Sequence, residues 1–146
     1  MKTVYILFGE MGSGKNYHGE KLSMNMGVEF LDGDTLLPEE MIERVSTFKP
    51  LSPEMIDNYI TNHLAPAILN RSELVLAQAL YMDKHRLFLR DFLEDQGYTV
   101  VFYWVKPKFW NNLKQIYSRP KGFKWVLYWL MNKPFFQKPS HDHQIF

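Results

Sequence analysis

The chain contains no cysteine, carries almost no net charge and has no apolar run long enough to cross a bilayer. The lack of cysteine excludes disulfide bonds and metal sites built on thiolates. A formal net charge of +1 gives no indication of a nucleic-acid partner. The apolar run near the N-terminus ends at Gly9 and shows no cleavage-site pattern, so we expect a cytoplasmic protein without a transmembrane segment.

The remaining composition is that of a globular protein. Hydrophobic residues make up 46% of the 146 residues, which is enough for a buried core. No repeat or low-complexity segment divides the chain. We therefore predict a single domain over residues 1–146.

Apolar runs typical of strands alternate with segments that carry helix start and stop signals. Val4–Phe8 is a continuous run of strand-forming residues and reads as a strand buried on both faces. Further strands are expected at 28–31, 74–79 and 98–105, and helices at 14–26, from 38, from 53 toward 70 with a kink near Pro66, at 83–96 and at 107–118. This alternation predicts an α/β fold with a parallel sheet.

The strongest motif follows the first predicted strand. Residues 9–16 read Gly-Glu-Met-Gly-Ser-Gly-Lys-Asn, which contains the spacing G-x-x-x-x-G-K of a phosphate-binding P-loop (Walker A motif) between a strand and a helix. Glycines let the backbone N–H groups of such a loop turn toward an anion, and the lysine reaches the outer phosphates. The motif predicts nucleoside triphosphate binding, with ATP as the cofactor, by Gly9, Met11, Gly12, Ser13, Gly14, Lys15 and Asn16.

Asn16 departs from the usual motif. P-loops carry serine or threonine after the lysine, and that hydroxyl ligates Mg²⁺. An amide oxygen can also ligate Mg²⁺, but from a longer side chain. The sequence thus predicts nucleotide binding more firmly than metal-assisted turnover.

Beyond the P-loop, the chain resembles the gluconate kinase family of small P-loop kinases. Residues 30–38 read Phe-Leu-Asp-Gly-Asp-Thr-Leu-Leu-Pro, close to that family's F-L-D-G-D-x-L-H-P stretch, and Lys49–Glu54 resembles its P-L-T/S-D stretch. Ala79-Leu80, followed by His85-Arg86 and Leu89-Arg90, is similar to its segment after the third strand. The D-G-D element is shared with shikimate and adenylylsulfate kinases.

The resemblance implies a P-loop NTPase three-layer sandwich of the nucleoside-monophosphate-kinase type. It implies that ATP binds with Mg²⁺ at the P-loop, and that a small-molecule acceptor binds across a cleft near Asp32 and Asp34. Asp34 is the preferred base for the acceptor hydroxyl, and Asn16 and Asp34 are the candidate Mg²⁺ ligands. Arg86 and Arg90 are the candidates for binding an anionic group of the acceptor. An acceptor-side helical insertion is expected at about residues 35–70.

The same resemblance implies a lid-like segment at about residues 119–146. Arg119 matches the family's first lid arginine and would neutralise charge in the transition state. The segment 123–136 is unusually aromatic for a lid: we expect it to pack on the core as a helix or to contact a partner, a membrane surface or a second copy of the chain. His141-Asp142-His143 is a poor candidate metal site.

Several residues on the acceptor side depart from the family pattern. Leu37 replaces a histidine, Tyr81 replaces a lysine, and Pro53–Ile56 replaces an acidic and basic run. The first expectation is a kinase for a gluconate-like sugar acid. A nucleoside or shikimate-type kinase and a catalytically weak nucleotide-binding module that acts through a partner are the alternatives.

Overall fold

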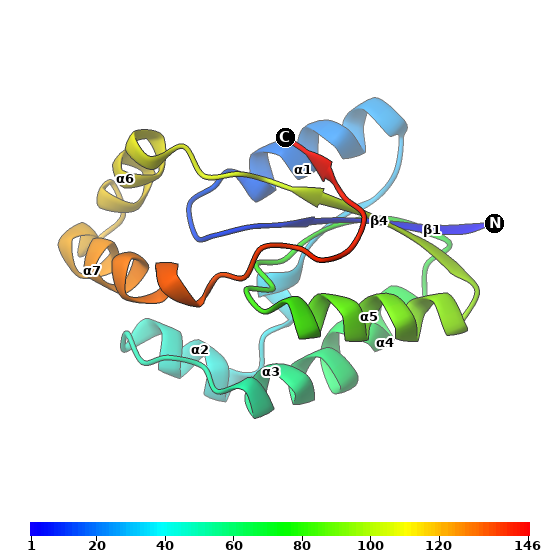
Figure 1. The fold of residues 1–146 in the computed structure, drawn as a ribbon, viewed down its shortest axis with the longest axis horizontal. Coiled ribbons are helices and arrows are strands. Elements are labelled where there is room, and N and C mark those ends of the chain that lie inside the picture. Colours follow the sequence, from blue (N-terminus) through cyan, green and yellow to red (C-terminus); the bar gives the residue numbers. More distant parts are fainter.

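Five parallel strands form the centre of the computed structural model, which describes residues 1–146 (Figure 1). The strands lie in the order β2–β3–β1–β4–β5, and every pairing is parallel. Their bounds are β1 Lys2–Phe8, β2 Phe30–Asp32, β3 Glu73–Ala77, β4 Tyr98–Trp104 and β5 Gln144–Ile145. The predicted α/β fold with a parallel sheet is confirmed.

Seven α-helices surround this sheet. Their bounds are α1 Lys15–Met26, α2 Glu39–Ser46, α3 Pro53–Tyr59, α4 Ala65–Leu69, α5 Asp83–Asp95, α6 Phe109–Tyr117 and α7 Gly122–Asn132. Helix α1 covers one face of the sheet, whereas α3, α4 and α5 lie on the other (Figure 1). Helices α6 and α7 lie at the carboxyl ends of β1 and β4 (Figure 1).

The core is divided by the sheet into two unequal parts. The larger part joins residues such as Ile6 and Phe8 of β1 to α4 and α5, and the smaller part joins Leu7 and Val75 to the side of α1. Because alternate residues of a strand point to opposite faces, Ile6 and Leu7 enter different parts of the core. The central strands are thereby held rigidly from both sides.

Local signals in the sequence set several helix ends as expected. Gly27 adopts φ 66° and ends α1, with its N–H donating to the carbonyl of Ser23. Ser52 caps α3 by accepting a hydrogen bond from the N–H of Met55, with Pro53 in the first turn. These ends fix where the loops next to the sheet begin.

The expected helix from 53 toward 70 is interrupted differently from the prediction. A π-helical turn, η2 (Ile60–Leu64), joins α3 to α4, and Pro66 is the second residue of α4. Pro66 has no N–H to donate and would crowd the carbonyl four residues earlier, and the wider turn places that carbonyl elsewhere. The proline is accommodated without a break in the helical path.

The end of the chain holds a strand that the sequence did not predict. Residues 136–143 cross the sheet and place β5 beside β4, where Gln144 pairs with Tyr103. Phe146 then stacks on His18 of α1, with ring centroids 4.8 Å apart. A two-residue strand is too short to leave a recognisable pattern, since its position depends on contacts with distant residues.

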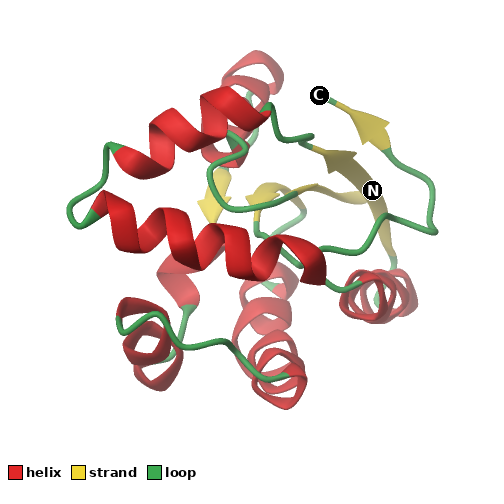
Figure 2. Cartoon of the chain, turned by 60° about the vertical axis from the view of Figure 1, so that its left-hand side comes forward, coloured by secondary structure: helices red, strands yellow, loops and turns green.

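The aromatic segment 123–136 packs on the core as a helix, which is the first of the two alternatives expected for it. It forms α7 and the 3₁₀ turn η3 (Lys133–Phe135), and α7 lies beside α6 in front of the strands in Figure 2. Tyr128 and Trp129 are buried, whereas Phe123, Leu127, Leu130, Met131 and Phe135 are exposed. The inward side packs on the fold, and contact of the outward side with a partner stays a prediction. No helix of the protein is both long and apolar enough to cross a membrane.

Candidate functional site

The P-loop lies between β1 and α1, as the motif predicts. Gly12 and Gly14 adopt φ angles of 73° and 94°, which other residues rarely adopt. A Cβ atom at Gly12 would lie 2.8 Å from Cγ1 of Ile116, so glycine also lets the loop pack against α6. The loop is therefore shaped by backbone conformation and by close packing together.

A cavity of about 850 Å³ opens beside this loop. Met11, Gly12, Gly14, Lys15 and Asn16 line it on the P-loop side. Gly9 and Ser13 do not line the cavity. Gly9 instead lies so close to Val105 that a Cβ atom would be 2.5 Å from its carbonyl oxygen, and Ser13 Oγ is buried. The wall of the cavity therefore does not include these two predicted cofactor residues, and their part in binding stays a prediction.

Lys15 lies at the centre of the charged part of the cavity. Its Nζ donates a hydrogen bond to the carbonyl oxygen of Glu10, 2.8 Å away. Burial lowers the pKa of its ammonium group to about 8, and the positive charge of Arg119 adds to this effect against the opposing carboxylates of Asp34 and Asp32. An anion bound beside Lys15 would therefore stabilise the positive charge of its ammonium group.

The two aspartates of the D-G-D element have different surroundings. Asp32 is the N-cap of the 3₁₀ turn η1 (Gly33–Leu36): its Oδ1 accepts from the N–H of Asp34, and its Oδ2 accepts from Nδ2 of Asn16, both at 3.0 Å. Asp34 lines the cavity, whereas Asp32 does not. The structure therefore places Asp34, the preferred residue, at the cavity wall and holds Asp32 behind it.

Asp34 is positioned by Gln78, which the sequence did not single out. Nε2 of Gln78 donates to Oδ1 of Asp34 at 3.0 Å, and the hydroxyl of Tyr59 lies 2.5 Å from Oε1 of Gln78. Desolvation and the nearby Asp32 raise the pKa of the Asp34 carboxyl, against the lowering effect of Lys15 and of the Gln78 hydrogen bond. A carboxylate with a raised pKa is suited to accept a proton.

Gly33 makes this arrangement sterically possible. A Cβ atom on Gly33 would lie 2.0 Å from Oε1 of Gln78. The glycine of the D-G-D element is therefore needed for the approach of Gln78 to Asp34, and not only for a turn.

Two further contacts of the P-loop were not predicted. The N–H of Met11 donates to the hydroxyl of Tyr81 at 2.9 Å, and Nζ of Lys133 lies 3.0 and 3.2 Å from the carboxylate oxygens of Glu10. Glu10 is 5% exposed, so its charge depends on Lys133 for compensation. In the sequence, Tyr81 stood out only because it replaces the lysine of the family pattern. No feature of the sequence identified Glu10 or Lys133 as part of the site.

The three arginines predicted for the site differ in whether they line the cavity. Arg119 lines the cavity near Lys15, and its guanidinium lies 5.7 Å from the ring centroid of Trp125. Arg86 and Arg90, expected to bind the acceptor, do not line the cavity. Only Arg119 is brought together with the P-loop.

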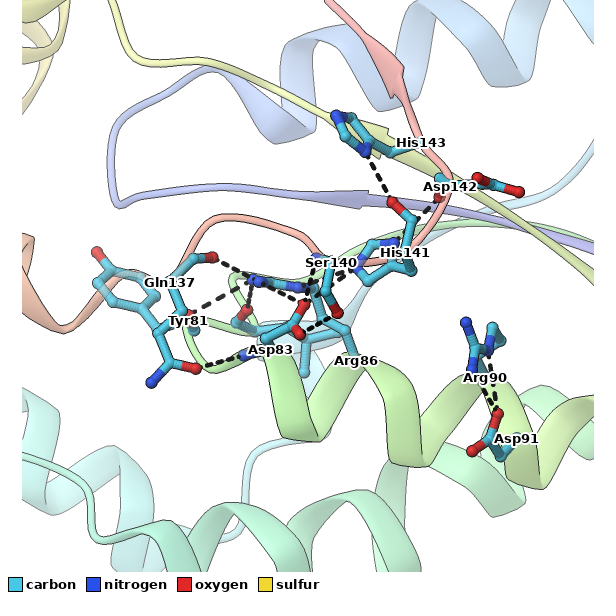
Figure 3. A network of polar contacts seen from close by, with 11 residues as sticks. Tyr81, Asp83, Arg86, Arg90, Asp91, Gln137, Ser140, His141, Asp142 and His143 are labelled. Carbon is cyan, nitrogen blue, oxygen red and sulfur yellow. Dashed lines mark hydrogen bonds and ion pairs between the residues drawn. The ribbon is translucent and has the colours of Figure 1, made fainter.

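The expectation for Arg86 and Arg90 is corrected by their contacts, which Figure 3 shows. Arg86 is fully buried and donates to the carbonyls of Leu80 and Gln137, at 2.6 and 2.5 Å, while it also contacts Asp83 and His141. Arg90 lies farther along α5 and pairs with Asp91 at 2.9 Å. Arg86 anchors the C-terminal segment, and Arg90 belongs to the outer surface.

The histidines of the tail also have a structural place. His141 is buried against Phe102, with ring centroids 4.1 Å apart. No group of three or more His, Cys, Asp or Glu side chains in the chain is arranged to hold a metal ion. His143 lies edge to face with Trp104, with ring centroids 5.8 Å apart, so both histidines contribute to packing of the tail on β4.

Gluconokinases are among the proteins whose sequences are similar to this chain. Thermoresistant gluconokinase of Escherichia coli (strain K12) is 28% identical over 108 residues, covering 73% of this chain and 60% of that protein. Thermosensitive gluconokinase of the same strain is 42% identical over 50 residues, covering 34% of this chain and 27% of that protein. The chain is a distant relative of the gluconokinases. It spans less than two thirds of the length of either one, and no family model matches it.

The fold agrees with this relationship. The crystal structure of a gluconokinase from Sinorhizobium meliloti 1021 superposes with a TM-score of 0.80 at 17% identity, covering 98% of this chain and 81% of that one. The predicted P-loop fold of the nucleoside-monophosphate-kinase type is confirmed by this likeness.

Proposed function

We propose that this gluconokinase-like chain is an ATP-dependent phosphotransferase that moves the γ-phosphate of ATP to a hydroxyl group of a small metabolite. The observation that carries the proposal is that Lys15 of the P-loop and Asp34 face one cavity. A phosphate-binding cation and a carboxylate base at one site are the elements that phosphoryl transfer needs.

Each residue has a role in this reaction. The backbone of the loop and Lys15 bind the phosphates, and Arg119 stabilises negative charge that develops during transfer. Asp34 accepts the proton of the acceptor hydroxyl as its oxygen bonds to the γ-phosphorus and the bond to ADP breaks. Gln78 holds the Asp34 carboxylate in place. The rate gain comes mainly from positioning and charge stabilisation.

The residues beside Lys15 fit a magnesium ion bound together with ATP. Mg²⁺ binds through one or two carboxylates, waters and substrate phosphates rather than through an all-protein cage, which agrees with the absence of a preformed cluster. Asp34 and the side-chain oxygen of Asn16 would hold it, and it would supply charge neutralisation at the phosphates.

A nucleotide-binding module with little turnover is the second candidate, and one observation favours it. Nδ2 of Asn16 already donates to Asp32, so the side chain that replaces the usual hydroxyl is held by a carboxylate and only its amide oxygen is left for a metal ion. Such a protein would bind ATP and act through a partner, for which the exposed side of α7 is the candidate surface.

Calorimetry with ATP and millimolar Mg²⁺, followed by assays of ADP release with a panel of hydroxyl acceptors, separates these candidates. We expect wild-type turnover that is lost in Lys15→Ala and Asp34→Asn, with ATP binding retained in Asp34→Asn. ATP binding without turnover on any acceptor would support the second candidate. A wild-type protein that does not bind ATP would contradict both.

A further inference from the structure

Charged side chains occupy only one end of the cavity. Lys15, Asp34 and Arg119 are the only charged residues in its wall, and their mutual electrostatic influence shows that they lie together near the P-loop. Past Asp34 the wall is formed by side chains from η1 to α3 and from α7. It includes Leu37, Met41, Val45, Leu51, Ile56 and Trp125. The acceptor half is therefore apolar.

No cation is available in this half to bind an acid. The guanidinium of Arg86 is already bonded to buried carbonyl groups, one of them in the tail, and Arg90 lies outside the cavity, where it pairs with Asp91. Arg44 on α2 donates from Nε and Nη2 to the carbonyl of Pro50, at 3.0 and 2.8 Å, and lines a separate small surface pocket. A carboxylate in the apolar half would lose its hydration without a partner, which is strongly unfavourable.

The polar side chains in this half are Tyr59, Gln78, Tyr81, Tyr128 and Asn132, and each already has a hydrogen-bond partner in the protein. Gln78 donates to Asp34, Tyr59 is engaged with Gln78 and the carbonyl of Gly33, and Nδ2 of Asn132 donates to the carbonyl of Tyr128 at 2.8 Å. A polyhydroxylated chain would bury several hydroxyl groups without partners, each at a cost of about 1–3 kcal/mol. Asp34 can receive one hydroxyl.

We propose that the acceptor is an uncharged alcohol with a single reactive hydroxyl and an apolar, ring-containing body, rather than a sugar acid. This inference rests on the proposed function for the reaction itself, in which the alcohol oxygen bonds to the γ-phosphorus, ADP leaves and the hydroxyl proton passes to Asp34. The ring is expected to pack against Trp125 and Tyr128, whose own rings meet edge to face 5.9 Å apart.

Binding without nucleotide tests the substrate class separately from the reaction. The probes are 3-phenylpropan-1-ol and 3-phenylpropanoate, which share a shape but differ in charge, together with gluconate. The titrations follow tryptophan fluorescence, with Trp125→Phe identifying the local signal. We expect the alcohol to bind at least tenfold more tightly than the acid. Equal or tighter binding of 3-phenylpropanoate or gluconate would overturn the proposal.

A gain of acid binding provides the complementary test. Val45→Arg and, at a second position, Leu51→Lys each place a cation in the apolar wall. We expect at least a tenfold gain in affinity for 3-phenylpropanoate in whichever variant melts within a few degrees of the wild type. If wild type already binds the acid as tightly as a folded variant does, the inference is wrong.

Turnover completes the experiment. With ATP present, 3-phenylpropan-1-ol should increase ADP release over the background, whereas gluconate should not. If the protein binds the alcohol but not ATP, the proposed function is contradicted, whereas the preference of the apolar half for an uncharged alcohol is still supported. Transfer to gluconate and not to the alcohol would support the proposed function and contradict the inference.

Discussion

The side-chain amide of Asn16 donates to Oδ2 of Asp32 across 3.0 Å and so joins the end of the P-loop to the end of β2. In a P-loop with serine or threonine at this position, the side chain faces the metal instead. The hydrogen bond makes Asn16 a residue at which the effect of the P-loop on turnover can be tested apart from nucleotide binding.

Replacing Asn16 by threonine tests this directly. Asn16→Thr should raise Mg²⁺-dependent ADP release by about tenfold, because a hydroxyl replaces the amide beside the metal position. Asn16→Ala is the matched control, since it also frees Asp32 but supplies no ligand. A rise of equal size in both variants would show that release of Asp32, and not the hydroxyl, is responsible.

Gln78 is expected to control the titration of Asp34. The donor from Gln78 lowers the pKa of the Asp34 carboxyl, so Gln78→Met should raise it. A general base works only when deprotonated, so the acid limb of the kcat/KM profile should move to higher pH, with a loss in rate of about tenfold or more at neutral pH. Tyr59→Phe, which removes only the contact behind Gln78, should give a smaller shift. An unmoved acid limb in Gln78→Met would mean that Asp34 is not the base.

Affinity for ATP should depend on pH through Lys15. Its pKa of about 8 means that the ammonium group loses its proton above pH 8 in the protein without nucleotide. Since phosphates bind the charged form, ATP affinity should fall above pH 8 by up to about tenfold per pH unit, as calorimetry at pH 7 and pH 9 would detect. Lys15→Arg keeps its charge at both values and should show no such fall. A wild-type affinity that does not change between pH 7 and pH 9 would contradict the assignment.

Arg86 and Arg90 should differ in their effect on stability. Arg86→Met leaves the carbonyls of Leu80 and Gln137 without a donor and should cost about 3–5 kcal/mol in the free energy of unfolding. Arg90→Met, on the same helix but at the surface, should change it by no more than about 0.5 kcal/mol. Urea unfolding of both variants measures this difference. Similar stability of the two, with acceptor binding lost in Arg86→Met, would restore the original expectation for Arg86.

Lys133 should support ATP binding without being part of the P-loop. Lys133→Met leaves the buried carboxylate of Glu10 uncompensated next to the phosphate site, and we expect the Kd for ATP to rise about tenfold or more. Glu10→Gln removes that charge, so the double variant should recover most of the affinity. A double variant as weak as Lys133→Met would assign the loss to altered packing of η3.

The fold and the phosphate loop could be predicted because their signals are local. Gly12, Gly14 and Lys15 act within one turn of chain, and the strands before and after them are continuous apolar runs. Asp34 was found through the resemblance of the short D-G-D element to the gluconate kinase family.

The rest of the site depends on contacts between distant residues. The Tyr81 hydroxyl meets Met11 across 70 positions, and Lys133 meets Glu10 across 123. The burial of Arg86 likewise depends on a tail that returns to the sheet from 51 positions away. No periodicity or spacing in the sequence encodes such pairs, so an arginine next to a family motif was taken for a binding residue.

The close approach of Gln78 to Gly33 has a consequence for related sequences. With only 2.0 Å between Oε1 and the position of a Cβ atom, a side chain at position 33 would force the Gln78 side chain away from its place beside Asp34. The two positions should therefore vary together during divergence: lineages that lose the glycine should carry a shorter residue at 78. Related chains that keep both Gly33 and Gln78 should hold the Asp34 carboxylate in the same way, even where their P-loop sequences differ.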